Sequence, residues 1–323
     1  MISFFPGFYK DENVYSVLAR CDHYCCLKSY RDSIKSVFGD DNTLPTLEFP
    51  CKLGELATTL ELDGIDVKTI ISNHTMFPLY SPFLPVERQR NITNKMIYGS
   101  GKGIKSEIGF LAGSICKKTG LYYCPICSSE EYELYGEAYL HRLHQAQGVF
   151  VCGKHHCYLK EYSVKLIDTS RLSFIKLERD QLAFNCETES NGIKLETMLK
   201  ISSGVEFLLN NDLSYLDKMI VEDSYRKQLK KSGFTTISGR IHQQDLCKAI
   251  KDFFFFFILN TFESSLDTEN EYNWVRVLTR KGNRVVHPIR HLLFINFLFG
   301  DIKGFIDNLN ERESKPLVYP CLN

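Results

Sequence analysis

The sequence has 323 residues, of which 44% are hydrophobic and 13% aromatic, a composition that excludes intrinsic disorder and allows two or more domains. Its 39 basic and 39 acidic residues cancel, so net charge identifies no partner, although a local basic surface can still bind nucleic acid. No signal-peptide pattern is present, and the most apolar run, residues 253–259, is too short to span a membrane. We therefore expect a soluble, cytoplasmic protein whose 12 cysteines are buried thiols or metal ligands.

The first sixty residues predict short helices joined by tight turns. Asp11 can cap a helix over residues 12–28, and Ser29 can cap a second helix that Gly39 ends. A third helix is expected over residues 52–60. Three such helices form either a small helix-turn-helix-like bundle or an ordinary helical subdomain, and the pattern alone favours the second.

A proline-rich stretch follows and is expected to be irregular. Its three prolines forbid a continuous helix, so we predict a fixed loop anchored by Phe77, Tyr80 and Phe83. Val86 then begins a helix that Gly99 ends.

Two pairs of potential metal ligands occur in the middle of the chain. A Cys-x-x-Cys pair is followed, after 24 intervening residues, by a Cys-x-x-His pair: Cys124, Cys127, Cys152 and His155. Two residues between ligands let both side chains of a tight turn reach one ion, and two such turns complete the tetrahedron that zinc prefers. His156 or Cys157 could replace His155 or Cys152, because both lie within reach of the same turn.

Such a site would be structural rather than catalytic, because four protein ligands leave no open coordination position. Cys116 lies far from any partner in the sequence and is expected to be a core thiol. His141 and His144, spaced for one helix, could form half of a second metal site. Polar packing or phosphate contact is favoured for them, since no acidic or cysteine partner is evident.

An enzymatic role finds little support in the sequence. The acids nearest the ligand pairs fit a helical run on the surface: Glu130, Glu131, Glu133 and Glu137. No His-Glu-x-x-His motif is present, and no carboxylate cluster suits two-metal phosphoryl chemistry. We expect a binding protein with one structural Zn²⁺ and no catalytic residues.

The last third of the chain carries local positive charge. Residues 226–251 contain seven basic residues and one acid, a difference of +6. A helix, a glycine and a second helix in this stretch suggest a helix-turn-helix, whose second helix would present Gln243 and Gln244 to base edges. The residues expected to contact DNA are Arg226, Lys227, Lys230, Lys231, Arg240, Gln243, Gln244, Arg280, Arg284 and Arg290. A solvated basic face is the alternative, and on charge alone it is favoured.

Several motifs resemble one known family. "FFPGFYKDENVYSVLAR", "NHTMFPLYSPFLP", "GSGKGI", the segment from Tyr122 to His156 and "HPIRHLLFINFLFG" together are similar to the TniQ/TnsD family of transposon target-site selectors, most closely to the TnsD type. The similarity covers residues 1–165 with specific motifs and 225–323 with looser ones. It implies that Cys124, Cys127, Cys152 and His155 are the zinc ligands.

The resemblance also implies an overall organisation and a role. We expect a mainly α fold of helix-turn-helix modules with an inserted zinc finger or ribbon. Its parts would be a TniQ region (1–108), a zinc-finger module (109–165), a helical connector (166–220) and a basic C-terminal region (221–323). The family binds attachment-site DNA and recruits a TnsC-type AAA+ ATPase, which is expected to contact the first hundred residues. Such a protein would be bacterial and associated with the nucleoid.

Two further points stay open at this stage. A TniQ adaptor that docks on an RNA-guided CRISPR effector complex, without reading DNA sequence itself, is the alternative function. Cys321 resembles the first ligand of another zinc knuckle without partners, which suggests a truncated or shortened chain.

Overall fold

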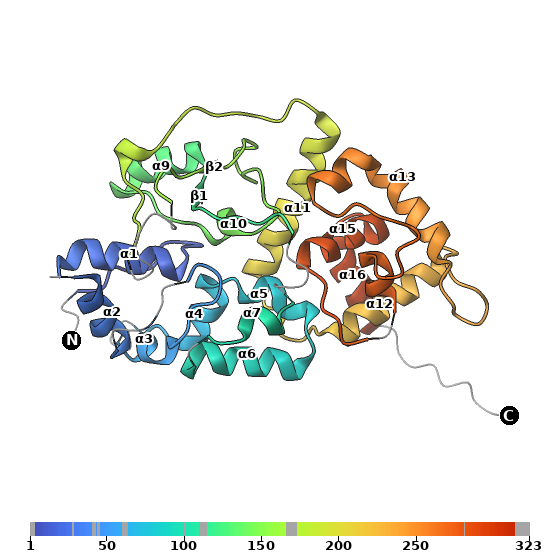
Figure 1. Ribbon diagram of the computed structural model, residues 1–323, viewed down its shortest axis with the longest axis horizontal. Helices are drawn as coiled ribbons and strands as arrows, with labels where there is room; N and C mark the ends of the chain where they lie inside the picture. The colour runs from blue at the N-terminus through green and yellow to red at the C-terminus, as the bar shows by residue number, and fades with distance from the viewer. Residues whose placement is uncertain are drawn as a thin grey trace.

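The computed structural model describes residues 4–27, 29–40, 43, 46–59, 64–99, 101–109, 115–165, 173–280 and 282–313. Within these residues the protein is mainly helical, with helices α1 to α7 along one side and α12 to α16 grouped at the other end (Figure 1). The segment that carries α9, α10 and the two strands lies above the N-terminal helices, and α11 runs between the two ends of the molecule.

The N-terminal helices are α1 (Val14–Cys25), α2 (Tyr30–Phe38), α3 (Leu53–Thr59) and α4 (Val67–His74). The structure confirms Ser29 as the cap of α2 and Gly39, with a φ of 73°, as its end. The expected capping of α1 by Asp11 is wrong, because the Asn13 side chain accepts from Tyr15 N instead. Asp11 is thereby available for a distant partner, Arg142.

The proline-rich stretch forms two short helices, α5 (Phe77–Tyr80) and the 3₁₀ helix η2 (Ser81–Phe83), rather than the expected loop. A proline falls in the first turn of each, where its missing N–H costs no hydrogen bond. Tyr80 and Phe83 are buried, as expected for anchors, and Phe77 is partly buried. Helix α6 (Val86–Tyr98) ends at Gly99 as predicted, and α7 (Ile104–Glu107) follows.

The cysteine-rich segment forms a compact ribbon. Strand β1 (Tyr122–Tyr123) pairs antiparallel with β2 (Lys160–Glu161), and residues Val151 and Tyr158 form an isolated bridge. Helix α9 (Pro125–Tyr135) and the short α10 (Arg142–Gln145) lie between these pairings in the chain. The pairings bring both ends of the segment together and so place its two turns side by side.

The C-terminal half contains η4 (Arg179–Gln181), α11 (Gly192–Asn210), α12 (Lys218–Lys231), α13 (Gln243–Thr261), α14 (Trp274–Thr279), α15 (Pro288–Phe299) and α16 (Ile302–Glu313). His287 caps α15 and Pro288 starts it. The connection between α12 and α13, residues 232–242, is longer than the turn of about three or four residues in a helix-turn-helix, and a bridge joins Thr235 to Ile241 within it.

One hydrophobic core joins the two halves. It extends from Val14 in α1 to Phe305 in α16 and includes residues from α11, which packs against α4, α5, α10 and α15. His291 of α15 stacks on Phe83 at 4.0 Å between ring centroids. The four-part division of the chain stays a prediction.

The run of phenylalanines in α13 is divided between the core and the surface. Phe254 is buried and Phe256 is 76% exposed, so the run is only partly in the core. Of the helices in the described residues, none is long and apolar enough to cross a membrane.

Candidate metal centre and basic cavity

The four predicted ligands come together at one point. Cys124 caps the N-terminus of α9 and Cys127 lies in its first turn, where Pro125 occupies a position that needs no hydrogen bond. Cys152 and His155 belong to the turn between Val151 and Tyr158. The three cysteines are buried and His155 is partly buried. We call these four residues the cysteine–histidine cluster.

The spacing of the donor atoms fits a tetrahedral ion. His155 Nδ1 lies 3.4 Å from Cys124 Sγ, 3.3 Å from Cys127 Sγ and 3.7 Å from Cys152 Sγ. The Cys127 and Cys152 sulfurs are 3.8 Å apart. Bonds of about 2.0–2.3 Å to one zinc ion require edges of roughly 3.5–3.8 Å. The cluster therefore matches a closed zinc site in both donor type and spacing.

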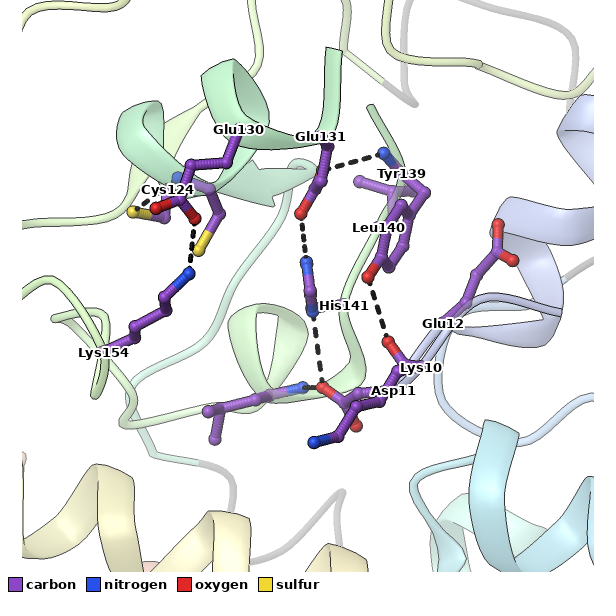
Figure 2. Close-up of polar contacts among 12 residues, drawn as sticks. Lys10, Asp11, Glu12, Cys124, Glu130, Glu131, Tyr139, Leu140, His141 and Lys154 are labelled. Carbon is purple, nitrogen blue, oxygen red and sulfur yellow. Dashed lines mark hydrogen bonds and ion pairs between the residues drawn. The ribbon is translucent and has the colours of Figure 1, made fainter. Parts of the chain in front are cut away.

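Neighbouring groups orient the histidine ligand and lower the pKa of one cysteine ligand. His155 Nε2 lies 3.3 Å from Glu130 Oε1. Figure 2 shows Lys154 paired with the same Glu130 carboxylate. A carboxylate on the second nitrogen of a ligand imidazole fixes which nitrogen faces the ion. Hydrogen bonds from the Cys127 and Cys152 thiols lower the pKa of Cys124 to about 3. A lowered pKa favours the thiolate, which is the form of cysteine that binds zinc.

The two alternative ligands do not join the cluster. His156 is exposed, and among the described residues it belongs to no group with metal-ligand spacing. Cys157 is buried with its sulfur 3.5 Å from Cys124 Sγ, but it is absent from the four-residue group. Burial, together with a hydrogen bond to Cys186, raises its pKa, which favours the neutral thiol.

The structure corrects the sequence-based view of His141 and the nearby acids. Glu131 and Glu137 are buried rather than on the surface, and Glu131 Oε1 lies 2.5 Å from His141 Nε2 (Figure 2). Glu137 instead pairs with the buried Arg20. His141 therefore does have an acidic partner, and Cys127 lies close enough to form a group of three with them.

The surroundings of His141 form a balanced ion network. Burial alone would lower its pKa, but contacts with Asp11 and Glu131 outweigh burial and raise it to about 10. A protonated His141 and Arg142 then balance the charges of Asp11 and Glu131. His144 is buried, and burial lowers its pKa to about 4, so neither phosphate contact nor a positive charge is expected of it.

A second candidate site is an open cavity of about 1020 Å³ at the C-terminal end of the molecule. We call it the arginine cavity, because four arginines from three separate segments line it together with two glutamines: Arg226, Arg240, Gln243, Gln244, Arg276 and Arg280. Arg226 lies in α12, Arg240 in the connection before α13, and Arg276 in α14. Two arginines of the basic stretch 226–251 thus meet Arg276 and Arg280 at one site.

Two polar atoms beside the arginine cavity lack partners. Gln243 donates from Nε2 to Thr279 Oγ1 at 2.9 Å, but its buried Oε1 atom has no hydrogen bond within the described part of the chain. The same holds for Arg276 Nε. Buried polar atoms normally have partners, so these two mark a place where water or a ligand completes the bonding. Glu271 and Asp245 also line the cavity and temper its positive charge.

The remaining basic candidates lie outside that cavity. Lys230 and Lys231 are exposed at the end of α12, and Lys227 pairs with Asp223. Arg284 lies 4.7 Å above the ring of Tyr272. Arg290 donates to Ser264 Oγ and to a main-chain carbonyl, and burial lowers its pKa. A role in DNA contact stays a prediction for all five. Cys321, the proposed start of a further knuckle, lies outside the described residues.

The mainly helical fold thus carries a cluster of four residues that could hold a metal ion and, apart from it, a basic cavity. Residues 3–159 match the family described as TniQ, and residues 201–323 match the family described as Tn7-like transposition protein D. The chain is 24% identical over 291 residues to the transposon Tn7 transposition protein TnsD of Escherichia coli. That alignment covers 89% of this chain and 56% of the relative, so the chain spans about half the relative's length.

The chain belongs to the TniQ/TnsD family of transposition proteins. The cysteine–histidine cluster falls within the TniQ match, whereas the arginine cavity falls within the TnsD match. The second family description names a Tn7-like transposition protein, and neither description names a catalytic activity.

Proposed function

We propose that this chain is a target-site selector for a transposon. In this role it binds attachment-site DNA through the arginine cavity and recruits a TnsC-type AAA+ ATPase that directs insertion. The observation that carries the proposal is the arginine cavity itself, in which four arginines and the two glutamines at the start of α13 converge.

The chemistry of the cavity suits double-stranded DNA. Arginines exposed to solvent neutralise phosphates, which positions a protein on the duplex without reading its sequence. Gln244 is exposed at the N-terminus of a long helix, where side chains can enter the major groove and pair with adenine, while Gln243 beside it is held by Thr279. Although their connection is long, α12 and α13 would act together as a helix-turn-helix-like reader, with Arg240 before the second helix.

The cysteine–histidine cluster would serve this function by stabilising the fold rather than by binding a substrate. Zinc bound by all four ligands has no open position for a substrate. It would instead hold α9 and the turn before Tyr158 together, where a disulfide could not persist in a reducing compartment. The zinc would thereby stabilise the TniQ part of the fold, and the DNA-reading part would be separate from it.

Selection of bound genomic fragments tests the proposal. The purified chain is incubated with fragmented host DNA at about physiological salt, where non-specific binding is weak. We expect enrichment of one attachment-site sequence, and we expect an Arg240→Glu/Arg280→Glu variant to lose that enrichment. Uniform recovery of all fragments would contradict sequence reading and would favour the adaptor that docks on an RNA-guided complex.

Recruitment of the ATPase is tested separately. The ATPase regulator of the same transposon is added to immobilised attachment-site DNA with and without this chain. We expect the ATPase to be retained at the site only when the chain is present. Equal retention without the chain would contradict the recruitment part of the proposal and leave DNA reading intact.

A further inference from the structure

The connection between α12 and α13 is a small hairpin beside the arginine cavity. The bridge that pairs Thr235 with Ile241 is followed by a hydrogen bond from Thr236 N to Arg240 O at 2.8 Å. Figure 1 shows this connection standing clear of the rest of the molecule, between α12 and α13. We call residues 234–242 the connecting hairpin.

The connecting hairpin is held in shape at its base and at its turn. At the base, Phe234 is partly buried against the core, with its ring centroid 6.1 Å from that of Phe297. In the turn, Arg240 N donates to Thr236 Oγ1 at 3.0 Å, and Gly239 supplies the left-handed conformation, with a φ of 81°. The tip is therefore positioned before a ligand arrives, which reduces the ordering cost of binding.

The tip of the connecting hairpin carries an apolar side chain. Ile237 is fully exposed, at 107%, and Met219, the next most exposed large hydrophobic residue in the described part of the chain, is at 77%. Turn positions usually take small or polar residues, and a fully exposed isoleucine adds nothing to the core. The neighbours of Ile237 on both sides, Thr236 and Ser238, line the arginine cavity. Ile237 thus stands at the rim of the candidate DNA site.

The connecting hairpin and the start of α13 face the same space. Gln244, at the N-terminus of α13, lines the arginine cavity together with Ser238, Gly239 and Arg240 of the hairpin. The major groove of DNA is wide enough to admit a helix or a two-stranded ribbon. A duplex that presents its major groove to Gln244 therefore presents the same groove to the hairpin tip.

The edges of the bases offer one apolar partner to an isoleucine in that groove. In the major groove they carry hydrogen-bond donors, acceptors and the methyl group of thymine, whereas minor-groove edges carry only polar groups. We infer that Ile237 packs against the methyl group of one thymine in the attachment site, an inference that rests on the proposed function. Ile237 is then a specificity-determining residue, which selects a base without a hydrogen bond.

Removal of single methyl groups from the DNA tests the inference. In the attachment-site fragment enriched by the selection, each thymine is replaced in turn by deoxyuridine, which lacks only the methyl group. Affinity for the full chain is measured by fluorescence anisotropy. We expect one replacement to weaken binding by about fourfold, the effect of one buried methyl group. Ile237→Ala should weaken binding of the unmodified fragment similarly and should show no further loss at that position.

Matched variants control for effects on folding and on charge. Ile193 of α11 is 53% exposed and lines a different cavity, so Ile193→Ala should keep both the affinity and the response to deoxyuridine. Ile237→Leu, which retains an apolar contact, should keep most of the response. Ile237→Ala removes no charge and should leave the salt slope unchanged, which distinguishes it from the loss of a phosphate contact.

The outcomes separate this contact from the proposed function. Equal affinity for every deoxyuridine fragment would overturn the inference and leave DNA reading by the rest of the cavity intact. Additive losses from Ile237→Ala and from deoxyuridine would also overturn it, because groups in contact are not additive. A thymine that becomes reactive to permanganate only when Ile237 is present would show insertion between bases instead. If the wild-type chain enriches no site, the inference and the proposed function both fall.

Discussion

The cysteine–histidine cluster and the arginine cavity hold their functional side chains in opposite ways. The ligands of the cluster come from two turns within 32 residues, from Cys124 to His155, and their donor atoms all lie within 4.8 Å of one another. The arginines of the cavity come from three segments and surround about 1020 Å³ of open space. One site is closed on itself, and the other is open to a large ligand.

Because of this difference, we expect the cluster to contribute to stability and the arginine cavity to contribute to recognition. A metal ion held by four protein ligands has no coordination position left for a substrate. The free energy of metal binding then stabilises the fold. Exposed arginines such as Arg240 and Arg280 contribute little to folding but are available to a partner. Perturbing the cluster should therefore change folding first, whereas perturbing the cavity should change binding with little effect on folding.

The largest effect is expected from loss of a zinc ligand. Cys124→Ser should reduce bound zinc from one ion per chain to well under one and destabilise the ribbon by several kcal/mol, because structural zinc contributes directly to folding. Elemental analysis and hydrogen exchange over residues 115–165 measure these changes. Cys26→Ser, at an exposed thiol, is the control and should change neither. Full zinc occupancy in Cys124→Ser would contradict the assignment of this ligand.

Acid should weaken the core that joins the two regions. Burial lowers the pKa of His287 and of His291 to about 3, compared with about 6.5 in the unfolded chain. Between these values the unfolded state binds more protons, so stability is complete above about pH 6.5 and is lost as the pH falls. At pH 5 each histidine should cost on the order of 2 kcal/mol.

The geometry around these histidines explains why they stay neutral. His287 Nε2 lies 3.0 Å from Gln147 Oε1 while its Nδ1 atom accepts from Ile289 N, and His291 Nδ1 contacts the Tyr225 hydroxyl at 3.1 Å. Urea unfolding between pH 7 and pH 5 measures the effect. His291→Gln should flatten the pH dependence, whereas His23→Gln, at an exposed site, should not. A stability that is constant over this range would contradict the prediction.

Reversal of charge in the arginine cavity should act on binding alone. Arg240→Glu/Arg280→Glu is expected to weaken DNA affinity by about ten- to a hundredfold and to reduce the salt slope by about two units, since each lost phosphate contact removes about one. Titrations at several salt concentrations measure the slope. The melting temperature should stay unchanged, and a fall comparable to that of Cys124→Ser would show that the cavity is part of the folding core.

The same contrast explains what the sequence could predict. Cys-x-x-Cys and Cys-x-x-His spacings are local, so the meeting of these four residues could be predicted from them, as could the Ser29 cap and the Gly39 end of α2. The prediction that Asp11 caps α1 was wrong, because the Asp11 carboxylate pairs with Arg142, which is 131 residues away in the chain. No local pattern contains such a contact.

Long-range contacts also account for the other corrections. Glu137 looked like a surface residue because helical charge runs usually are solvated, yet Arg20 of α1 buries it. The meeting of Arg240 with Arg276 and Arg280 likewise depends on how α14 packs beside the connection before α13. The sequence singled out Arg240 and Arg280 as candidate DNA contacts but could not show that they share a site.

The smallest effect is expected from lysines next to the cavity but outside it. Lys230 and Lys231 are exposed at the end of α12 and do not line the cavity. Lys230→Glu/Lys231→Glu should weaken DNA binding several-fold and flatten the salt slope, but less than the double arginine substitution does, because exposed flanking lysines contact phosphates without fixing the docking geometry. Equal effects of the two double variants would extend the DNA surface along α12, and an unchanged slope would restrict it to the arginine cavity.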